Sequence, residues 1–199
     1  MKAIAMLIIT AVIVLGAQLS QARQPHPEVK FKVLEDQSFA LYLGKIGHEK
    51  LKISLMDNSG HMLYNKTIDN KNSFKRKLNL HKLPAGNYRL EISDLISTRS
   101  YPIFLANKSL IIAKDEMITV FKPILNKSNN TVSLSLFSPA KYSHTLKIYN
   151  EHSEVVHGEE IEEKVNYHKQ FDFSKALPGS YSIVVKTQGH QYSYLVPIK

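Results

Sequence analysis

The strongest constraint on the fold of this 199-residue chain is that its two halves repeat each other. Three short motifs recur in the same order: Leu51-Lys52-Ile53 as Leu146-Lys147-Ile148, Leu83-Pro84-Ala85-Gly86-Asn87-Tyr88 as Leu177-Pro178-Gly179-Ser180-Tyr181, and Pro102-Ile103 as Pro197-Ile198. The first and third motifs recur after 95 residues, and the two tyrosines of the second are 93 residues apart. Self-similarity at nearly one offset predicts two tandem copies of one structural module.

Within each copy the apolar residues recur with a period of two, which is typical of half-buried β-strands. In the first copy this pattern predicts strands at Val29–Leu34, Ser38–Leu43, Lys50–Met56, His61–Ile68, Phe74–Leu80, Tyr88–Leu95 and Arg99–Leu105. In the second copy it predicts strands at Met117–Leu125, Thr131–Phe137, Thr145–Tyr149, Val155–Glu160, Tyr167–Phe173, Tyr181–Lys186 and Tyr192–Ile198. Short strands at spacings of about 8–12 residues predict an all-β chain of two tandem immunoglobulin-like β-sandwiches.

The N-terminus has the pattern of an export signal. Lys2 precedes an uncharged apolar stretch, and Ser20-Gln21-Ala22 offers small residues for cleavage. We therefore expect a signal peptide at 1–22, a first module at 23–106 and a second at 107–199, joined near Ala106–Ser109. An uncleaved anchor stays an alternative, and the run Leu110–Ala113 is either an added strand or part of the contact between modules. The protein is expected to be exported, to the periplasm, the cell surface or the medium, without a stable membrane span after cleavage.

The recurring Leu-Pro and Gly-x-Tyr pattern indicates a turn that leads into a strand. Proline stiffens such a turn, and glycine permits a positive φ where the chain reverses. A tyrosine at the start of the following strand commonly donates its hydroxyl hydrogen bond back to the corner, which is the role we expect for Tyr88 and Tyr181. The alternative is that these rings stack on a ligand.

Composition narrows the classes of partner. The absence of cysteine excludes disulfides and thiolate chemistry. The formal net charge is +9, but lysines and acids are interspersed apart from Lys75–Lys77, so we read them as solvated residues that keep sheet edges soluble. Affinity for anionic envelope polymers is the alternative. Nucleic acid is not expected as a partner, because the chain is exported and lacks a nucleic-acid-binding motif.

No residue is expected to be catalytic, cofactor-binding or metal-ligating, and the protein is not expected to be an enzyme or to need a cofactor. The histidines form no His-x-His or His-Glu-x-x-His pattern, although His152 and His157 are candidates for a pair near Glu154. The acidic run Glu159–Glu163 lacks the spacing of a calcium loop. Nucleophile and phosphate-loop motifs are missing from the sequence, which leaves a hydrolase as the remote alternative.

Four segments, two in each copy, carry a family resemblance. Leu51–Leu63 followed by Leu83–Ile92, with Leu146–Asn150 and Leu177–Tyr181 in the second copy, resembles the immunoglobulin-like modules exported by Bacteroidetes. These modules include the C-terminal sorting domains of the type IX secretion system. The resemblance implies a β-sandwich in an exported or envelope protein, and it carries over no catalytic residue.

The expected function is that of a non-enzymatic structural or interaction protein of the bacterial envelope, with a protein or glycan partner. One alternative is a glycan-binding accessory module that would stack sugars on its tyrosines: Tyr142, Tyr149, Tyr167, Tyr192 and Tyr194. The other is a sorting module of the secretion system. Any specific function should lie where the copies differ, in Asp57–Gly60 and Lys71–Lys77 of the first and Glu151–Glu163 of the second.

Overall fold

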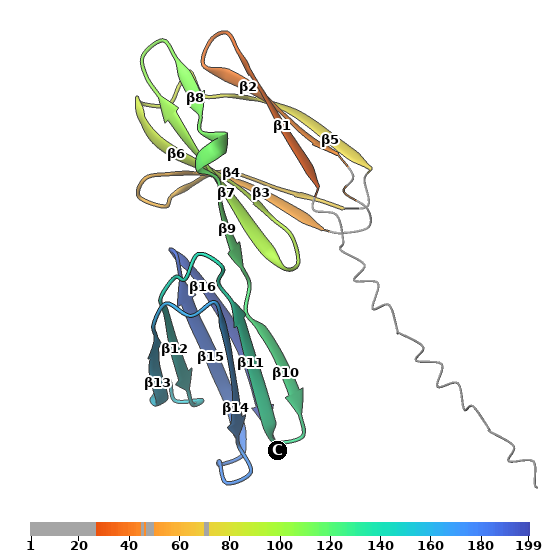
Figure 1. Ribbon diagram of the computed structural model, residues 1–199, viewed down its shortest axis with the longest axis vertical. Helices are drawn as coiled ribbons and strands as arrows, with labels where there is room; N and C mark the ends of the chain where they lie inside the picture. Colours follow the sequence, from red (N-terminus) through yellow and green to blue (C-terminus); the bar gives the residue numbers. More distant parts are fainter. Residues whose placement is uncertain (1–26, 45, 47–49, 70–71) are drawn as a thin grey trace, which may run out of the picture.

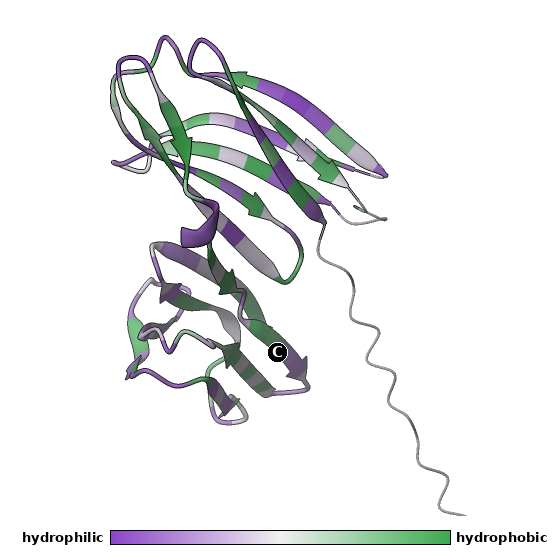
Figure 2. Cartoon of the chain, turned by 45° about the horizontal axis from the view of Figure 1, so that its top comes forward, coloured by the Kyte–Doolittle hydropathy of each residue, from purple (hydrophilic) through white to green (hydrophobic). Residues whose placement is uncertain are grey.

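The computed structural model describes residues 27–44, 46, 50–69 and 72–199, and over these residues it is built almost entirely of antiparallel β-strands (Figure 1). The expected signal peptide at 1–22 lies outside the described residues. Hydrophobic and hydrophilic residues alternate along the strands (Figure 2), as half-buried sheets require. No helix in the described part of the chain is long and apolar enough to cross a membrane.

The first sandwich packs a three-stranded sheet against a larger one. The small sheet has the order β1 (Glu28–Leu34), β2 (Ser38–Gly44) and β5 (Ser73–Asn79). The larger sheet has the order β4 (Met62–Ile68), β3 (Leu51–Asp57), β6 (Gly86–Ser93) and β7 (Ser97–Leu105). The inward residues of both sheets, such as Phe39, Leu41, Ile53, Leu90 and Ile103, are fully buried and form one core.

The second sandwich repeats this topology with a separate core. Its small sheet has the order β10 (Ile124–Ser128), β11 (Thr131–Phe137) and β14 (Asn166–Asp172). Its larger sheet has the order β13 (Val155–Ile161), β12 (His144–Tyr149), β15 (Gly179–Thr187) and β16 (His190–Ile198). Val132, Leu134, Leu146, Ile183 and Val185 are fully buried in its core. The predicted fold class, two tandem immunoglobulin-like β-sandwiches, is confirmed.

The two copies correspond at an offset of 93 residues from β2 to the end of the chain. Strands β2, β4, β5 and β7 span 38–44, 62–68, 73–79 and 97–105, and β11, β13, β14 and β16 lie 93 positions later. The β3–β4 turn at Asp57 and the β12–β13 turn at Asn150 make the same backbone bonds, to His61 and Glu154. The two motifs that recur after 95 residues in the sequence are therefore wrong as structural equivalents, because each second copy lies two residues beyond the true equivalent position. A slip of two keeps every side chain on the same face, so the alternation pattern cannot reveal it.

The segment after β7 belongs to the first sheet rather than to a linker. Ala106 to Ser109 form a turn closed by a 2.9 Å backbone bond, and β8 (Leu110–Ile112) and β9 (Ile118–Phe121) both pair with β7. A short 3₁₀ turn, η1 (Lys114–Glu116), separates them. The run Leu110–Ala113 is thus an added strand. Its apolar residues Leu110 and Ile112 complete the first core.

The predicted strand Met117–Leu125 is wrong, because it is two strands that serve different sandwiches. β9 pairs with β7 of the first, and β10 pairs with β11 of the second. Pro123 lies between them and has no N–H to donate to a continuous ladder. We propose Lys122-Pro123 as the boundary between the modules, in place of a boundary near residue 106.

After β7 the chain runs back along this strand as β8 and β9, and this path determines where the second sandwich begins. β9 ends with Phe121 opposite Ser97, beside the β6–β7 turn, so β10 starts there. The second sandwich therefore begins at the β6–β7 end of the first and brings its own equivalent β15–β16 turn to the same place (Figure 1). The junction between the sandwiches is built from these two turns and from Lys122-Pro123, the connector between β9 and β10.

Candidate functional site: the junction between the sandwiches

The repeated corner motif is structural in both copies. The Tyr88 hydroxyl donates a hydrogen bond to the Pro84 carbonyl at 2.6 Å, and the Tyr181 hydroxyl donates one to the Leu177 carbonyl at 3.0 Å. Both rings are buried in their cores. The predicted corner role is confirmed, and buried rings do not offer a stacking surface.

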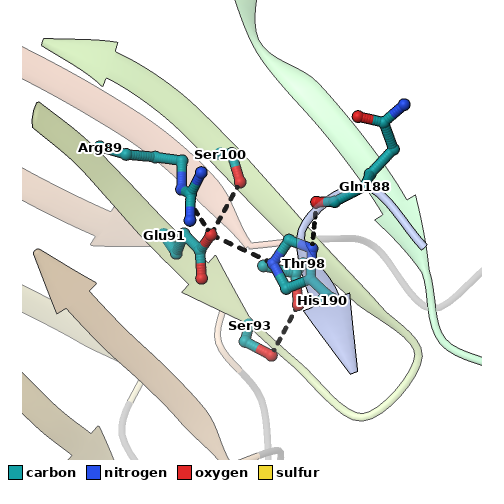
Figure 3. A network of polar contacts seen from close by, with 7 residues as sticks. All are labelled: Arg89, Glu91, Ser93, Thr98, Ser100, Gln188 and His190. Atoms are coloured by element: carbon teal, nitrogen blue, oxygen red, sulfur yellow. Dashed lines mark hydrogen bonds and ion pairs between the residues drawn. The ribbon is translucent and has the colours of Figure 1, made fainter. Parts of the chain in front are cut away.

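The junction contains a largely buried carboxylate that joins the two sandwiches. Glu91 Oε1 of β6 lies 3.1 Å from His190 Nε2 of the second sandwich (Figure 3). The same oxygen lies 2.8 Å from Arg89 Nε and accepts a hydrogen bond from Ser100 Oγ at 3.3 Å. The side chains of Glu91 and His190 are only 11% and 16% exposed, so this contact is shielded from bulk water.

The surroundings of Glu91 favour its charged form. Burial alone would raise the pKa of the Glu91 carboxyl, but the hydrogen bond and charge of His190, the charge of Arg89 and the Ser100 hydroxyl lower it further than burial raises it. The pKa therefore lies below its ordinary value. Removal of one partner from a buried, hydrogen-bonded carboxylate contact is destabilising, because the remaining polar or charged group stays buried without a partner.

His190 is held from both sides of its ring. Its Nε2 faces the Glu91 carboxylate, and its Nδ1 lies 3.0 Å from the Gln188 carbonyl (Figure 3). Both partners are hydrogen-bond acceptors. Because the Glu91 carboxylate is a charged acceptor, the cross-module hydrogen bond is charge-assisted, and such bonds are stronger than neutral ones.

The connector is fastened to the same turns. Asp94 Oδ1 accepts backbone hydrogen bonds from Ile96 at 2.9 Å and Ser97 at 2.6 Å, which shapes the β6–β7 turn. The Lys122 backbone N–H donates to the Ile96 carbonyl at 2.8 Å, and its ammonium donates to the Asp94 carbonyl. On the other side, Tyr194 of β16 donates its hydroxyl to the Pro123 carbonyl at 2.6 Å. The turn, the connector and the second sandwich are thus bonded in series.

An apolar cleft of about 540 Å³ lies where these parts meet. The first sandwich and the connector contribute Ile96, Phe121 and Lys122 to its lining, and the second sandwich contributes Ile124, Ser135, Leu136, Phe137, Asn166, Tyr167 and His168. Clefts of this size that lie between domains, with apolar walls and a few polar groups, are typical ligand sites.

The walls of the cleft combine exposed apolar side chains with a small polar group. Ile124 is 57% exposed, Phe137 46% and Ile96 45%. The Phe121 and Phe137 rings lie 4.9 Å apart at an interplanar angle of 58°. Ser135 Oγ and His168 Nδ1 form a 3.0 Å hydrogen bond at the margin. The arrangement suits an apolar side chain of a peptide segment, with the peptide backbone next to the polar groups at the rim.

A second cleft, of about 560 Å³, lies at the far end of the first sandwich. Its lining is polar: Asp36, Gln37, Asn79, His81, Asn107 and Lys108. Two of these side chains are already bonded locally, since Asn79 Oδ1 accepts a 3.0 Å hydrogen bond from the His81 N–H and Gln37 Nε2 donates to the Ala106 carbonyl. The junction cleft is therefore the stronger candidate.

The five tyrosines considered for sugar stacking do not form an exposed platform. Tyr167 is buried and donates to Glu159 Oε2 at 3.2 Å, and the Tyr194 hydroxyl is bonded to the connector. Tyr142, Tyr149 and Tyr192 are each only partly exposed. Burial, together with the charge of Glu159, raises the pKa of the Tyr167 phenol above its ordinary value.

The histidine and acid candidates for metal binding do not converge on one site among the described residues. His152 lies in the β12–β13 turn, where its N–H donates to Asn150 Oδ1 at 3.0 Å. The His157 ring lies 5.4 Å from that of Phe171, and Glu159 is paired with Lys169. Over the described residues, no group of three or more His, Cys, Asp or Glu is close enough to hold a metal ion.

Sequence reasoning missed Glu91, His190 and the aromatic pair of the cleft. A weak signal for the cleft is present, because Leu136 and Phe137 are consecutive apolar residues that break the alternation of Thr131–Phe137 and so place one of them outward. Nothing local to Glu91 or His190 indicates that they meet, since they are 99 residues apart and the return of the chain along β7 brings them together.

Comparison with known families gives one match. Residues 36–101 match the family described as the secretion system C-terminal sorting domain, a range that runs from the β1–β2 turn into β7. This confirms the resemblance to exported immunoglobulin-like modules that was inferred from the sequence, and it marks the protein as exported. Sorting tails and immunoglobulin-like modules are typically non-enzymatic. No curated protein matches the chain.

Several solved structures are similar over most of the chain. A biofilm-associated protein (BSP domain) is 11% identical over 87% of this chain, with a TM-score of 0.29, and the chain spans only 29% of that protein. A two-domain fibronectin type III segment of chicken tenascin is 9% identical over 87% of this chain and 99% of its own length, with a TM-score of 0.31. The ligand-binding domain of human OSCAR is 12% identical over 88% and 99%, with a TM-score of 0.25. TM-scores this low leave the fold assignment to the topology of the chain itself.

Proposed function

We propose that this exported protein, whose residues 36–101 match the sorting-domain family, is a non-enzymatic interaction protein of the bacterial envelope. In this proposal the two sandwiches act as one rigid unit, and the cleft between them binds an apolar side chain on an extended segment of a protein partner. The observation that carries the proposal is that the lining comes from both sandwiches and the connector at once.

The proposal is supported by the preorganisation of the cleft, whose walls are held in place without a ligand. A site formed by two domains binds well only if the domains are already fixed, because otherwise part of the binding free energy is spent on ordering them. The Glu91–His190 pair and the bonds of Lys122 and Tyr194 fix the walls before any ligand arrives. Phe121 and Phe137 then offer a ready apolar contact, of the kind that dominates binding at interfaces.

A peptide suits this cleft better than a glycan. The apolar lining would offer hydrogen-bond partners to few of a sugar's hydroxyl groups. A polar group that is buried without a hydrogen-bond partner costs free energy. An extended peptide places an apolar side chain inward, while its backbone meets Asn166, His168 and Ser135 at the margin. The tyrosines that a sugar would need are buried or bonded elsewhere.

The test is a peptide array probed with the mature chain, residues 23–199, and with two matched variants of it. Phe137→Ser removes one wall of the cleft. Val156→Ser is the control, because Val156 is 53% exposed on the β13 edge, away from the cleft. We expect peptides with an aromatic or aliphatic anchor to bind the wild type and the control equally, and to lose about tenfold in affinity with Phe137→Ser, as the loss of an interface anchor predicts. Equal binding by all three proteins, or no binding of any anchored peptide by the wild type, contradicts the proposal.

The family match favours a second candidate function, which is secretion sorting. Its test is a reporter protein placed between residues 1–22 and residues 23–199 and expressed in a bacterium with the secretion system. Release or surface display of the reporter is the expected result for a sorting module, and retention in the periplasm contradicts it. This outcome is independent of the peptide array.

A further inference from the structure

Among the described strands, the two sandwiches differ at the outer edge of β16 in how a sheet is closed. In the first sandwich, β8 and β9 cover the outer edge of the equivalent strand β7. In the second, β16 pairs with β15 on one side, and no strand in the described part of the chain pairs with its other side. From this difference we propose that β16 pairs antiparallel with β16 of a second copy of this chain.

The composition of β16 sets it apart from the other edges. Natural proteins protect exposed edge strands with charged residues, and each of the other described edge strands of five or more residues carries at least one. Examples are Lys66 on β4, Arg76 on β5, Lys127 on β10 and Lys169 on β14. β16, with the sequence HQYSYLVPI, has no Lys, Arg, Asp or Glu over nine residues. An unprotected edge of this length is a template for pairing with another strand.

The first sandwich shows which backbone groups point outward. The Pro102 carbonyl of β7 accepts a hydrogen bond from the Ala113 N–H at 3.0 Å. The backbone groups of Pro102, and of every second residue along β7 from it, therefore point toward the edge that β8 and β9 cover. At the 93-residue offset Pro102 corresponds to Leu195, and the outward residues of β16 are therefore Gln191, Ser193 and Leu195. Pro197 has the same parity, but it has no N–H, and the Lys127 ammonium already bonds to its carbonyl.

These groups specify a symmetric register. Two identical edges pair around a two-fold axis, which places residue i opposite j and j opposite i. A register centred on Ser193 uses Gln191, Ser193 and Leu195 and leaves Pro197 out. It sets Ser193 against Ser193 of the other copy, and Gln191 against Leu195. The side chain of Leu195, which is 73% exposed, is then partly covered.

Charge favours a second copy as the occupant. The residues after Pro123 hold eight lysines and seven acids, a formal net charge of +1, so nearly all of the +9 lies in the preceding residues. The charges are therefore less evenly distributed than the sequence reading assumed. Two second sandwiches can approach each other with little repulsion, whereas two first sandwiches would repel.

The test uses the mature chain in size-exclusion chromatography with light scattering, over a wide concentration range. We expect a concentration-dependent dimer. Ser193→Glu and Ser193→Lys should each be monomeric, because each sets two like charges opposite one another. A mixture of the two variants should dimerise again. Ser109→Glu, at an exposed turn of the first sandwich, is the control and should dimerise as the wild type does.

The absence of cysteine makes the register directly testable. Ser193→Cys should form a covalent dimer on mild oxidation, and Gln191→Cys should not, because its symmetry mate lies well away from it. Thermal unfolding checks that the Ser193 variants are folded, since this side chain gives up only an exposed hydrogen bond to Ser182. A wild type that stays monomeric at all concentrations, or a mixture of the charged variants that stays monomeric, overturns the proposal.

Discussion

Glu91 in β6 and His190 at the start of β16 lie 3.1 Å apart, although they belong to different sandwiches. At the 93-residue offset Glu91 corresponds to Val184, and His190 corresponds to Ser97, so neither partner is repeated in the other copy. The contact that fixes the junction therefore arises from the differences between two otherwise similar modules.

Glu91→Gln keeps the size of the side chain but removes the charge that His190 and Arg89 face. We expect the free energy of unfolding to fall by about 1–3 kcal/mol, the range for loss of a charged and buried hydrogen-bond partner. Calorimetry should also show the two cores unfolding less cooperatively. Glu116→Gln, in an exposed 3₁₀ turn, serves as the control and should leave both quantities unchanged. An equal effect of both substitutions would show that the pair does not couple the sandwiches.

His144 should make the stability of the second sandwich depend on pH. The ring is buried, neither of its nitrogens has a hydrogen-bond partner among the described residues, and burial lowers its pKa. A lowered folded-state pKa contributes stability above the unfolded value of about 6.5, and this stability is lost as the pH falls through the folded-state pKa. Urea unfolding should therefore show less stability at pH 5.5 than at pH 7.5.

The substitution His144→Phe keeps a ring in the core but cannot take up a proton. We expect it to remove most of that pH dependence, whereas His152→Phe, at an exposed turn, should retain it. If the His144→Phe chain loses stability between pH 7.5 and 5.5 as steeply as the wild type does, the assignment to His144 is wrong.

The corner tyrosines should contribute equally and independently. Tyr88→Phe and Tyr181→Phe each remove one hydrogen bond to a backbone carbonyl, at a cost of about 0.5–1.5 kcal/mol. Because the two rings lie in separate cores, the double variant should lose the sum of the two. Tyr42→Phe, at a partly exposed ring, is the control in the same denaturant series. A corner variant as stable as the control would argue against the corner role.

Lys169 protects an edge of the second sandwich. Its neighbours on the ladder, Leu134 and Leu136, are buried, so Lys169 points inward on edge strand β14 and pairs with Glu159 of β13 across the open side of the sandwich. Inward charge on an edge strand opposes pairing between molecules. We expect Lys169→Met to aggregate faster on warming, as followed by light scattering, and Lys175→Met, at an exposed corner, to behave like the wild type. Equal aggregation rates would contradict this role.

Alternation and turn residues were enough to predict most of the fold. Strands such as Ser38–Leu43 and Thr131–Phe137 agree with the structure within a residue, because burial on one face imposes a period of two that the sequence displays directly. The corner role of Tyr88 and Tyr181 was predictable for a similar reason, since all the groups involved are close in sequence. The family resemblance agreed with these local patterns.

The register of the repeat and the junction were not predictable in this way. The 95-residue matches at Leu146 and Pro197 lie on the correct faces, and only the ladder partners show that the true offset is 93. The cover of β7 by residues 110–121 depends on tertiary pairing, and it decides where the second sandwich starts. Glu91, His190 and Phe137 meet as a consequence of that placement, which no local pattern encodes.

The proposed function requires that the two sandwiches form one rigid unit with a site between them. Nitrogen-15 relaxation of residues 23–199 measures this rigidity, because it gives a rotational correlation time for each sandwich separately. We predict one common correlation time for both, and two distinct, shorter times in the Glu91→Gln variant. Two distinct times in the wild type would show that the sandwiches tumble independently, and a fixed cleft between them would then not exist.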